Sequence, residues 1–263
     1  MRTALTIAGS DPSGGAGAQA DLKTFAAHGV YGLSSITALT VQNSNGVSAV
    51  TPVDASLVAA QIDAVVSDFG ADATKIGMLA NAGLVVAVAD AISRHQLRHV
   101  VLDPVRHATA GAALLDYDAM AVLLERLLPV VALITPNAPE AAELTGMSIA
   151  SVADQRQAAL ALVERGARAV LVKGGHLEGP VIDVLYDGEK FTEFRSDRIE
   201  SPHTHGTGCA LSAAIAARLA LGAELVDAAR EAKRYVTAAI AQAPGLGQGR
   251  GPLQHFPNRD SLY

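Results

Sequence analysis

Residues that cross-link secreted proteins or stack on nucleic acids are scarce in this sequence. Of its 263 residues, Cys209 is the single cysteine, tryptophan is absent, and aromatic residues make up 4%. One cysteine cannot form an intrachain disulfide, which favours a reducing, cytoplasmic compartment. Without aromatic stacking residues or a basic stripe, and with a net charge of −6, the chain is not expected to bind nucleic acid.

Long hydrophobic runs are also missing. No apolar stretch approaches the roughly 18–20 residues of a membrane span, and the polar, Gly-rich start carries no signal-peptide cleavage pattern. We therefore expect no membrane partner. Hydrophobic residues nevertheless make up 50% of the chain, which excludes a disordered protein. Most of them are small and aliphatic, as is typical of helices packed on a parallel sheet.

Short apolar runs alternate with helical patterns along most of the chain. The predicted strands are 3–8, 31–41, 74–78, 99–103, 130–134 and 169–173, and the predicted helices are 18–28, 55–69, 82–95, 116–127, 138–144 and 152–165. Two further helices begin near Gly206 and Val226. This order predicts an α/β fold with a mostly parallel sheet covered on both faces. A small β-hairpin is predicted at 181–194, and no linker divides the chain, so we expect one domain, 1–263.

Several polar segments follow predicted strands. The Gly-rich loop 9–17, Asp103, Asn137 and Lys173 all stand at such positions. Ligands of open parallel sheets bind beyond the carboxyl ends of the strands, so these segments should gather at one edge. Lys173 could instead be a solvated residue at the end of a strand, without a ligand contact.

The segment 201–214 carries the strongest chemical signal. Gly206, Thr207, Gly208 and Cys209 lead directly into an Ala-rich helix. Glycine lets the backbone approach a ligand, and the first N–H groups of a helix attract anions. A thiol at this position is expected to have a lowered pKa. The alternative is a Gly-rich turn that caps a helix beside a buried cysteine.

Other motifs are less specific. No Walker A loop occurs, and the Gly-rich loop 9–17 lacks the acidic partner of a dinucleotide-binding fingerprint. Asp21, on the helix after that loop, could face a ligand or the solvent. His203 and His205 form a weak candidate metal pair, because no third ligand stands at a suitable spacing. Met78, after Lys75, Ile76 and Gly77, is more often a core residue than a ligand contact.

Asn137 and Glu140 have the spacing of a helix capping box. The same Glu140, together with Asp103 at another strand end, could instead hold Mg²⁺ beside phosphates, because magnesium prefers oxygen ligands and retained water. The sequence leaves both interpretations open.

Seven segments together resemble one enzyme family over nearly the whole chain. They are ALTIAGSDPSGGAGAQADLKTFAAHGVYG, SSITALTVQNSNGV, KIGML, VLDPV, LITPNAPEAAELTG, VLVKGGH and HTHGTGCALSAAIAA. The chain resembles the hydroxymethylpyrimidine/phosphomethylpyrimidine kinases of thiamine biosynthesis, within the ribokinase-like superfamily. The GTGC form, with a cysteine where most ribokinase-like sugar kinases carry aspartate, marks this branch.

The resemblance implies a three-layer α/β/α sandwich that forms a homodimer. It implies two successive phosphoryl transfers from ATP with Mg²⁺. The first acts on 4-amino-5-hydroxymethyl-2-methylpyrimidine, and the second converts the monophosphate to the diphosphate.

The resemblance also assigns residue roles by matching position. Gln42 would read the pyrimidine, since an amide offers one donor and one acceptor group. At the substrate end, the resemblance implies pocket walls at Gly9, Met78 and Val105 and polar contacts at Asp21 and Lys233. For the nucleotide, it implies contacts at Lys173, Asn137 and Thr207 and magnesium ligands at Asp103 and Glu140. For the reacting groups, it implies an anion hole at Gly206 and Gly208 and a general base at Cys209. A thiolate base would matter for the first transfer more than for the second, in which a phosphate oxygen is already the nucleophile.

One segment departs from the family pattern. After DPV the family usually continues with a Met-containing stretch and a Lys-Ser-Gly-like turn, whereas Arg106 and His107 stand here, with Gly111 keeping the turn. Arg106 could pair with a phosphorylated substrate or point to solvent. Two other functions stay open: a pyridoxal kinase of the same superfamily, and a non-catalytic ligand-binding protein on this scaffold.

Overall fold

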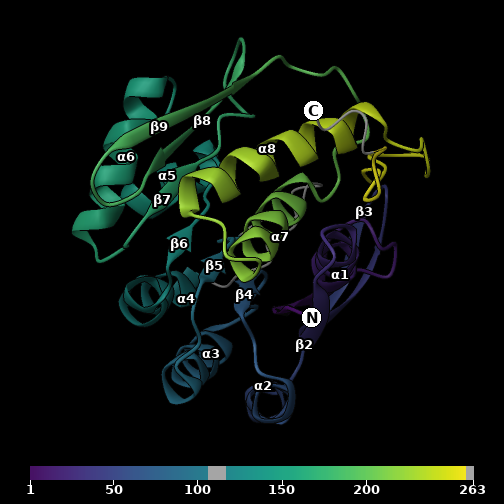
Figure 1. The fold of residues 1–263 in the computed structure, drawn as a ribbon, viewed down its shortest axis with the longest axis vertical. Helices are drawn as coiled ribbons and strands as arrows, with labels where there is room; N and C mark the ends of the chain where they lie inside the picture. Colours follow the sequence, from purple (N-terminus) through teal and green to yellow (C-terminus); the bar gives the residue numbers. More distant parts are fainter. Residues whose placement is uncertain (106–116, 259–263) are drawn as a thin grey trace.

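The computed structural model describes residues 1–105 and 117–258, and a mixed β-sheet runs through its centre (Figure 1). In these residues the sheet has nine strands in the order β3-β2-β1-β4-β5-β6-β7-β8-β9. The strands are β1 Thr3–Ser10, β2 Tyr31–Asn43, β3 Gly46–Pro52, β4 Ala73–Ile76, β5 Val100–Leu102, β6 Leu133–Ile134, β7 Val170–Val172, β8 Val181–Tyr186 and β9 Phe191–Ser196. From β2 to β7 all neighbours pair in parallel, and the outer strands β3, β8 and β9 are antiparallel.

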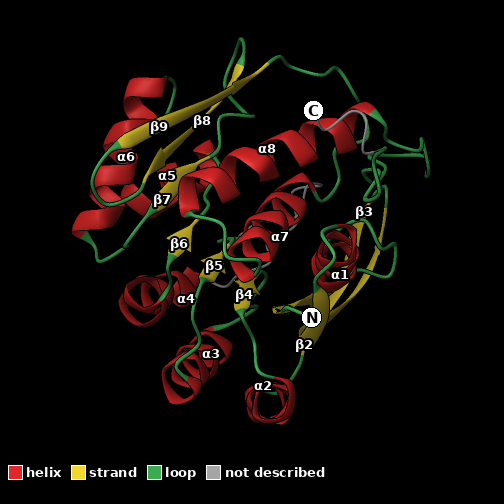
Figure 2. Ribbon diagram, viewed as in Figure 1, coloured by secondary structure: helices red, strands yellow, loops and turns green. Residues whose placement is uncertain are grey.

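Helices cover both faces of the sheet, which gives the expected three layers (Figure 2). One face is covered by α1 Gly17–Ala27, α7 Thr207–Ala220 and α8 Leu225–Ala241. The other face is covered by α2 Ala55–Phe69, α3 Ala82–His95, α4 Tyr117–Val122, the π-helical η1 Leu123–Leu127, the 3-10 turn η2 Leu128–Val130, α5 Ala138–Thr145 and α6 Val152–Glu164.

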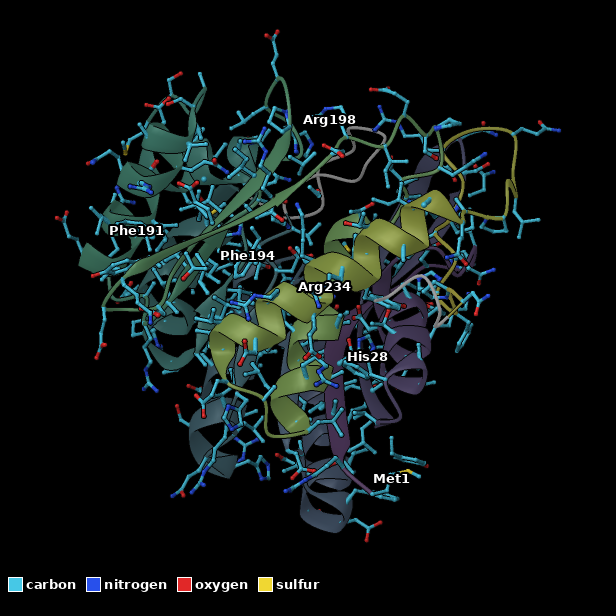
Figure 3. All side chains as sticks on the ribbon, turned by 45° about the horizontal axis from the view of Figure 1, so that its top comes forward. Met1, His28, Phe191, Phe194, Arg198 and Arg234 are labelled. Carbon is cyan, nitrogen blue, oxygen red and sulfur yellow. The ribbon has the colours of Figure 1, made fainter. Side chains whose placement is uncertain are left out.

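The two layers of helices pack on two separate hydrophobic cores. Because successive side chains of a strand point to opposite faces, Leu5 and Ile7 of β1 join the core under α2 and α3, while Ala4 joins the core under α1 and α7. The outer strand β9 follows the same rule, with Phe191 and Phe194 on opposite faces (Figure 3). Strands buried on both sides explain the nearly continuous apolar runs of the sequence.

Most predicted elements are confirmed. The predicted helices 55–69 and 82–95 coincide with α2 and α3, and the predicted hairpin is β8–β9. Asp54 caps α2 by accepting a hydrogen bond from Ser56 N at 2.8 Å. Strand β3 was missed, since its apolar and polar residues do not alternate regularly and none of them is fully buried. The predicted strand 130–134 is shorter, because Pro129 lies in the turn η2 just before it.

The parallel strands place their carboxyl ends at one edge of the sheet. The loops that follow β1, β4, β5, β6 and β7 meet the N-terminus of α7 there. No helix in the described ranges 1–105 and 117–258 is long and apolar enough to cross a membrane.

Candidate active site

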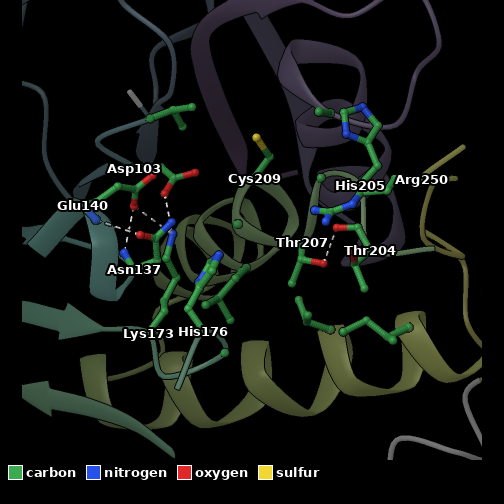
Figure 4. Close-up of a pocket in the computed structure, with 18 of the residues that line it drawn as sticks. Asp103, Asn137, Glu140, Lys173, His176, Thr204, His205, Thr207, Cys209 and Arg250 are labelled. Carbon is green, nitrogen blue, oxygen red and sulfur yellow. Dashed lines mark hydrogen bonds and ion pairs between the residues drawn. The ribbon is translucent and has the colours of Figure 1, made fainter. Parts of the chain in front are cut away.

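A pocket of about 800 Å³ opens at the carboxyl edge of the sheet. Figure 4 shows Cys209 between a group formed by Asp103, Asn137, Glu140 and Lys173 and a second group around His205 and Thr207. These side chains come from loops far apart in the sequence. The sheet topology brings them together, as predicted from their positions after strands.

The pocket has two ends. Gln42 and Gly9 line it at the β2 and β1 side, with Met78 from the loop after β4. Val105, two residues after Asp103 in the loop after β5, also lines the pocket. A Cβ atom at Gly9 would come within 3.1 Å of Met78 Sδ, so these residues form a close-fitting wall. Asn137, Glu140 and Lys173 line the opposite side, and Cys209 lies in between.

The N-terminus of α7 points its amide groups at the middle of the pocket. Gly206 caps the helix with φ +82°, a conformation that favours glycine, and a Cβ there would lie 1.8 Å from Gly15 O. Thr207 N and Oγ1 both bond to Thr204 O, whereas Gly208 and Cys209 are among the first-turn residues that have no intrahelical acceptor. A Cβ at Gly208 would lie 3.2 Å from Lys173 Nζ. This arrangement suits a phosphate group.

The expectation of an acidic thiol at Cys209 is wrong. The half-buried side chain lines the pocket, and its burial raises the pKa of Cys209 to about 11. The charge of Lys75 opposes this rise only in part, while the carboxylates of Asp21 and Asp103 add to it. Desolvation therefore outweighs the favourable helix terminus.

Asp21 does not line the pocket, so the predicted direct contact with substrate needs correction. Its carboxylate is fully buried and accepts hydrogen bonds from Lys75 Nζ at 2.8 Å and from Thr6 Oγ1 at 2.6 Å. Lys75, on β4, does line the pocket and was missed as a site residue. Burial opposes its charge, but Asp21 beside it holds the pKa of Lys75 above the ordinary value. Asp21 thus acts through Lys75.

Lys173 lies between the two predicted metal ligands. Its Nζ is 2.8 Å from Asp103 Oδ1 and 3.8 Å from Glu140 Oε2. Glu140 also forms the predicted capping box with Asn137, in which Asn137 Oδ1 accepts from Glu140 N at 2.8 Å and Glu140 Oε2 accepts from Asn137 N at 2.8 Å. Burial raises the pKa of Glu140 to about 7, against the opposing charge of Lys173.

The donor set around Lys173 fits magnesium only together with phosphates. No cluster of three or more potential metal-ligating side chains occurs in the described part of the chain. Two carboxylates that leave further positions to water and phosphate are nevertheless the arrangement that Mg²⁺ commonly uses. Asp103 and Glu140 would hold the ion, which would neutralise phosphate charge. The pair His203 and His205 is not part of such a cluster, and His205 Nε2 lies 2.8 Å from Asp11 Oδ2.

Lys233 lies at the other end of the pocket from the one predicted. Its Nζ pairs with Asp183 Oδ2 of β8 at 2.7 Å. β8 lies six strand positions from β2, which carries Gln42, or about 28 Å at the usual spacing of neighbouring strands. Lys233 therefore stands on the side of Lys173, away from Gln42. Arg106, His107 and Gly111 lie outside the described residues.

The fold and this pocket define an α/β kinase of the ribokinase-like class, with the N-terminus of α7 between the two ends of the pocket. Residues 11–254 match the family described as phosphomethylpyrimidine kinase, and the chain belongs to this family.

Curated relatives carry the name of this family, and a solved pyridoxal kinase structure shares the fold. The chain is 53% identical to the hydroxymethylpyrimidine/phosphomethylpyrimidine kinase of Rhizobium meliloti (strain 1021). The alignment spans 257 residues and covers 96% of each protein. It is 49% identical over 257 residues to the protein of that name from Escherichia coli (strain K12), covering 96% of this chain and 97% of that protein. The structure of an ADP complex of Bacillus subtilis pyridoxal kinase is similar with a TM-score of 0.90 and 41% identity, over 97% of each chain.

Proposed function

We propose that this protein transfers the γ-phosphoryl group of ATP to 4-amino-5-hydroxymethyl-2-methylpyrimidine, and then a second one to the resulting monophosphate. One observation carries the proposal. A single pocket joins the Gln42 end to the Lys173 end, and the N-terminus of α7 with Cys209 lies between them. A ring held by Gln42 and a nucleotide held near Lys173 would meet at the amide groups of Gly208 and Cys209.

The chemistry of the first transfer follows from these positions. The hydroxymethyl oxygen forms a bond to the γ-phosphorus while the bond from that phosphorus to the ADP oxygen breaks. The N–H groups at the start of α7 stabilise the charge on the transferred phosphoryl oxygens. The Cys209 thiolate accepts the hydroxyl proton, and the buried ammonium of Lys75 stabilises that thiolate. With a pKa of about 11, about one thiol in ten thousand is ionised at pH 7.

The second transfer makes different demands. Its nucleophile is a phosphate oxygen that is already ionised, so no proton has to leave. Positioning and charge stabilisation are then sufficient. Lys173 and Asn137, with Asp103 and Glu140 as holders of Mg²⁺, would serve the nucleotide in both transfers, and Thr207 would meet it from the other side of Cys209.

A phosphorus NMR time course tests this function. Purified protein is mixed with ATP, Mg²⁺ and the aminopyrimidine, and the phosphate signals are followed. We expect a phosphomonoester signal that rises first and a diphosphate signal that replaces it. Consumption of ATP without either product, or no consumption at all, would contradict the proposal and favour a non-catalytic ligand-binding role.

Phosphorylation of pyridoxal is the second candidate. It is favoured by the similarity to the Bacillus subtilis pyridoxal kinase structure, which extends over 97% of each chain. Both substrates carry a hydroxymethyl group on an aromatic ring, so the transfer chemistry is the same. The residue that recognises the ring distinguishes the two substrates. Gln42 offers the paired donor and acceptor that an aminopyrimidine edge needs.

We further propose that the chain acts as one kinase domain, in the cytoplasm, as a homodimer. The two-stranded ribbon β2–β3 supports the dimer, because the face turned away from Gln42 exposes Leu39 and Val41. Their exposed fractions are 56% and 61%. Adjacent apolar side chains this exposed at the sheet edge suit the same surface of a second copy.

A further inference from the structure

The loop 174–179 directly follows Lys173 and connects β7 to β8. Two of its residues, Gly175 and His176, line the pocket, and Figure 4 shows His176 beside Lys173. Glycine loses more conformational freedom on ordering than any other residue, and this loop contains three glycines. The contacts that order the loop therefore determine whether it is in place before a ligand arrives.

Asp183 of β8 holds the start of this loop. Its Oδ1 accepts a hydrogen bond from Gly174 N at 2.8 Å, and its Oδ2 accepts one from Lys233 Nζ of α8 at 2.7 Å. Asp183 is only 4% exposed, so its charge needs a partner, and Lys233 supplies it. Because both oxygens are bonded, the carboxylate links the loop to α8 through β8.

Gly174 is enclosed on its other side as well. A Cβ atom at this position would collide with Ile182 O of β8. The buried side chain of Gln155, on α6, donates through Nε2 to Ile182 O and to Val172 O, each at 3.0 Å. The first residue after Lys173 is therefore fixed by β7, β8 and α6 together.

Arg198 holds the remainder of the loop. Its Nη1 donates to Gly175 O at 2.9 Å, its Nη2 to Leu177 O at 2.5 Å and its Nε to Gly179 O at 3.2 Å. Three carbonyl groups of alternate residues thus meet one planar guanidinium, which presents several donors in a rigid arrangement. All three of its nitrogens are bonded to the loop, so the loop fixes the orientation of the guanidinium.

Arg198 also connects two walls of the pocket. It lies two residues after the end of β9, near the position labelled in Figure 3. The segment 197–202, to which it belongs, lines the pocket on the way to α7. The guanidinium therefore joins this segment to the loop 174–179, at the end of the pocket that contains Lys173.

We propose that Asp183 and Arg198 are positioning residues that order the loop 174–179 in advance and thereby strengthen the binding of the nucleotide. This inference rests on the proposed function, which places the nucleotide near Lys173. Lys233 takes part as the counter-charge of Asp183, which gives a role to a residue that the sequence assigned to the other end of the pocket. A loop that is already ordered does not have to lose its conformational freedom when the ligand binds.

The test measures dissociation constants of the full-length protein for Mg·ADP and for 4-amino-5-hydroxymethyl-2-methylpyrimidine by calorimetry. In Arg198→Ala we expect the affinity for Mg·ADP to fall about tenfold, while the affinity for the pyrimidine changes less than about twofold. Arg198→Lys keeps the positive charge, but one ammonium cannot bond all three carbonyl groups, so it should recover little. Arg195→Ala is the matched control, because Arg195 is an exposed arginine of β9 that does not line the pocket.

Hydrogen exchange measures the order of the loop directly. Without nucleotide, the amides of 174–179 should exchange faster in Arg198→Ala than in wild type, and Arg195→Ala should match wild type.

A second pair of variants approaches the loop from its other side. Asp183→Ala and Asp183→Asn both remove the charge opposite Lys233, but only the asparagine keeps an oxygen for Gly174 N. We expect Asp183→Ala to weaken Mg·ADP binding at least about fivefold and Asp183→Asn to recover most of this loss.

Three results would overturn the proposal: unchanged Mg·ADP affinity or unchanged loop exchange in Arg198→Ala, full recovery in Arg198→Lys, or equal losses in the two Asp183 variants. Binding of Mg·ADP that depends on Arg198 in a protein that transfers no phosphate would contradict the proposed function and leave this inference standing.

Discussion

At the scale of single residues, Cys209 separates the two proposed transfers. Cys209→Ala removes the proton acceptor but leaves the backbone N–H groups of α7 in place. We expect the first transfer to slow by about 100-fold or more, and the second by less than about fivefold. Each transfer is measured separately, with the hydroxymethylpyrimidine or its monophosphate as starting substrate. Equal losses in both transfers would mean that the thiol only shapes the pocket.

The raised pKa of Cys209 leads to a pH dependence. Below a pKa of about 11 the thiolate fraction rises with pH, by about tenfold for each pH unit. At saturating substrate, the first transfer in wild type should therefore accelerate between pH 7 and pH 9, whereas the second should not follow this slope. Cys209→Ala provides the control, because its first transfer should lose the slope. A flat wild-type profile would exclude the thiolate as the proton acceptor in the rate-limiting step.

Replacing Glu140 should weaken the binding of the nucleotide and leave the binding of the pyrimidine nearly unchanged. Glu140→Gln keeps the size of the side chain and can still accept from Asn137 N through its carbonyl oxygen, but it removes the charge beside Lys173. We expect the KM for Mg·ATP to rise about tenfold with little change in the KM for the aminopyrimidine. A rise in the pyrimidine KM instead would place Glu140 at the other end of the pocket.

At the scale of elements, the buried pair Asp21–Lys75 joins α1 to β4. Asp21→Asn leaves the Lys75 ammonium without its counter-charge, and breaking such a pair typically costs about 3–5 kcal/mol of unfolding free energy. The double variant Asp21→Leu, Lys75→Met removes both charges and should be clearly more stable than the single variant.

Chemical denaturation of wild type, the single variant and the double variant measures these free energies. Although more stable, the double variant should not catalyse the first transfer, because it lacks the Lys75 ammonium that stabilises the Cys209 thiolate. A single variant as stable as wild type would contradict the role of the pair in holding α1 to the sheet.

The outcome for these elements shows what periodicity can predict. Strands buried on both faces and helices such as α3 follow from apolar patterns. The pair Asp21–Lys75 had a signal that was not used: Asp21 stands four residues before Phe25 on the buried face of α1, and Lys75 lies inside an apolar strand. A charge on a buried face requires a partner, but the partner's identity comes from tertiary packing alone.

The site could be predicted only in part, because the sequence shows the order of the strands' ends but not the tertiary packing around each side chain. The residues after parallel strands were expected at one edge, and the structure brings Gly9, Asp103, Asn137 and Lys173 into one pocket, together with Cys209. Lys233 was assigned to the wrong end because α8 follows no strand that would fix its position. The raised pKa of Cys209 was missed because desolvation depends on surrounding atoms that no local motif describes.

At the scale of the whole molecule, the exposed face of the β2–β3 ribbon should mediate dimerisation. Val41→Asp places a charge in the proposed interface and should shift the protein from dimer to monomer in light scattering coupled to gel filtration. Leu57→Asp is the matched control, because Leu57 is 55% exposed on α2, outside the ribbon. A monomeric wild type, or equal dissociation of both variants, would contradict the proposed interface.

The central claim is that one pocket selects an aminopyrimidine and phosphorylates it twice. A competition in one tube tests it most directly: wild-type protein receives ATP, Mg²⁺ and equal concentrations of the hydroxymethylpyrimidine and pyridoxal, and phosphorus NMR follows all products. The account predicts that the pyrimidine monophosphate and then its diphosphate form well before any pyridoxal phosphate. Faster formation of pyridoxal phosphate, or a pyrimidine product that stops at the monophosphate, would contradict it.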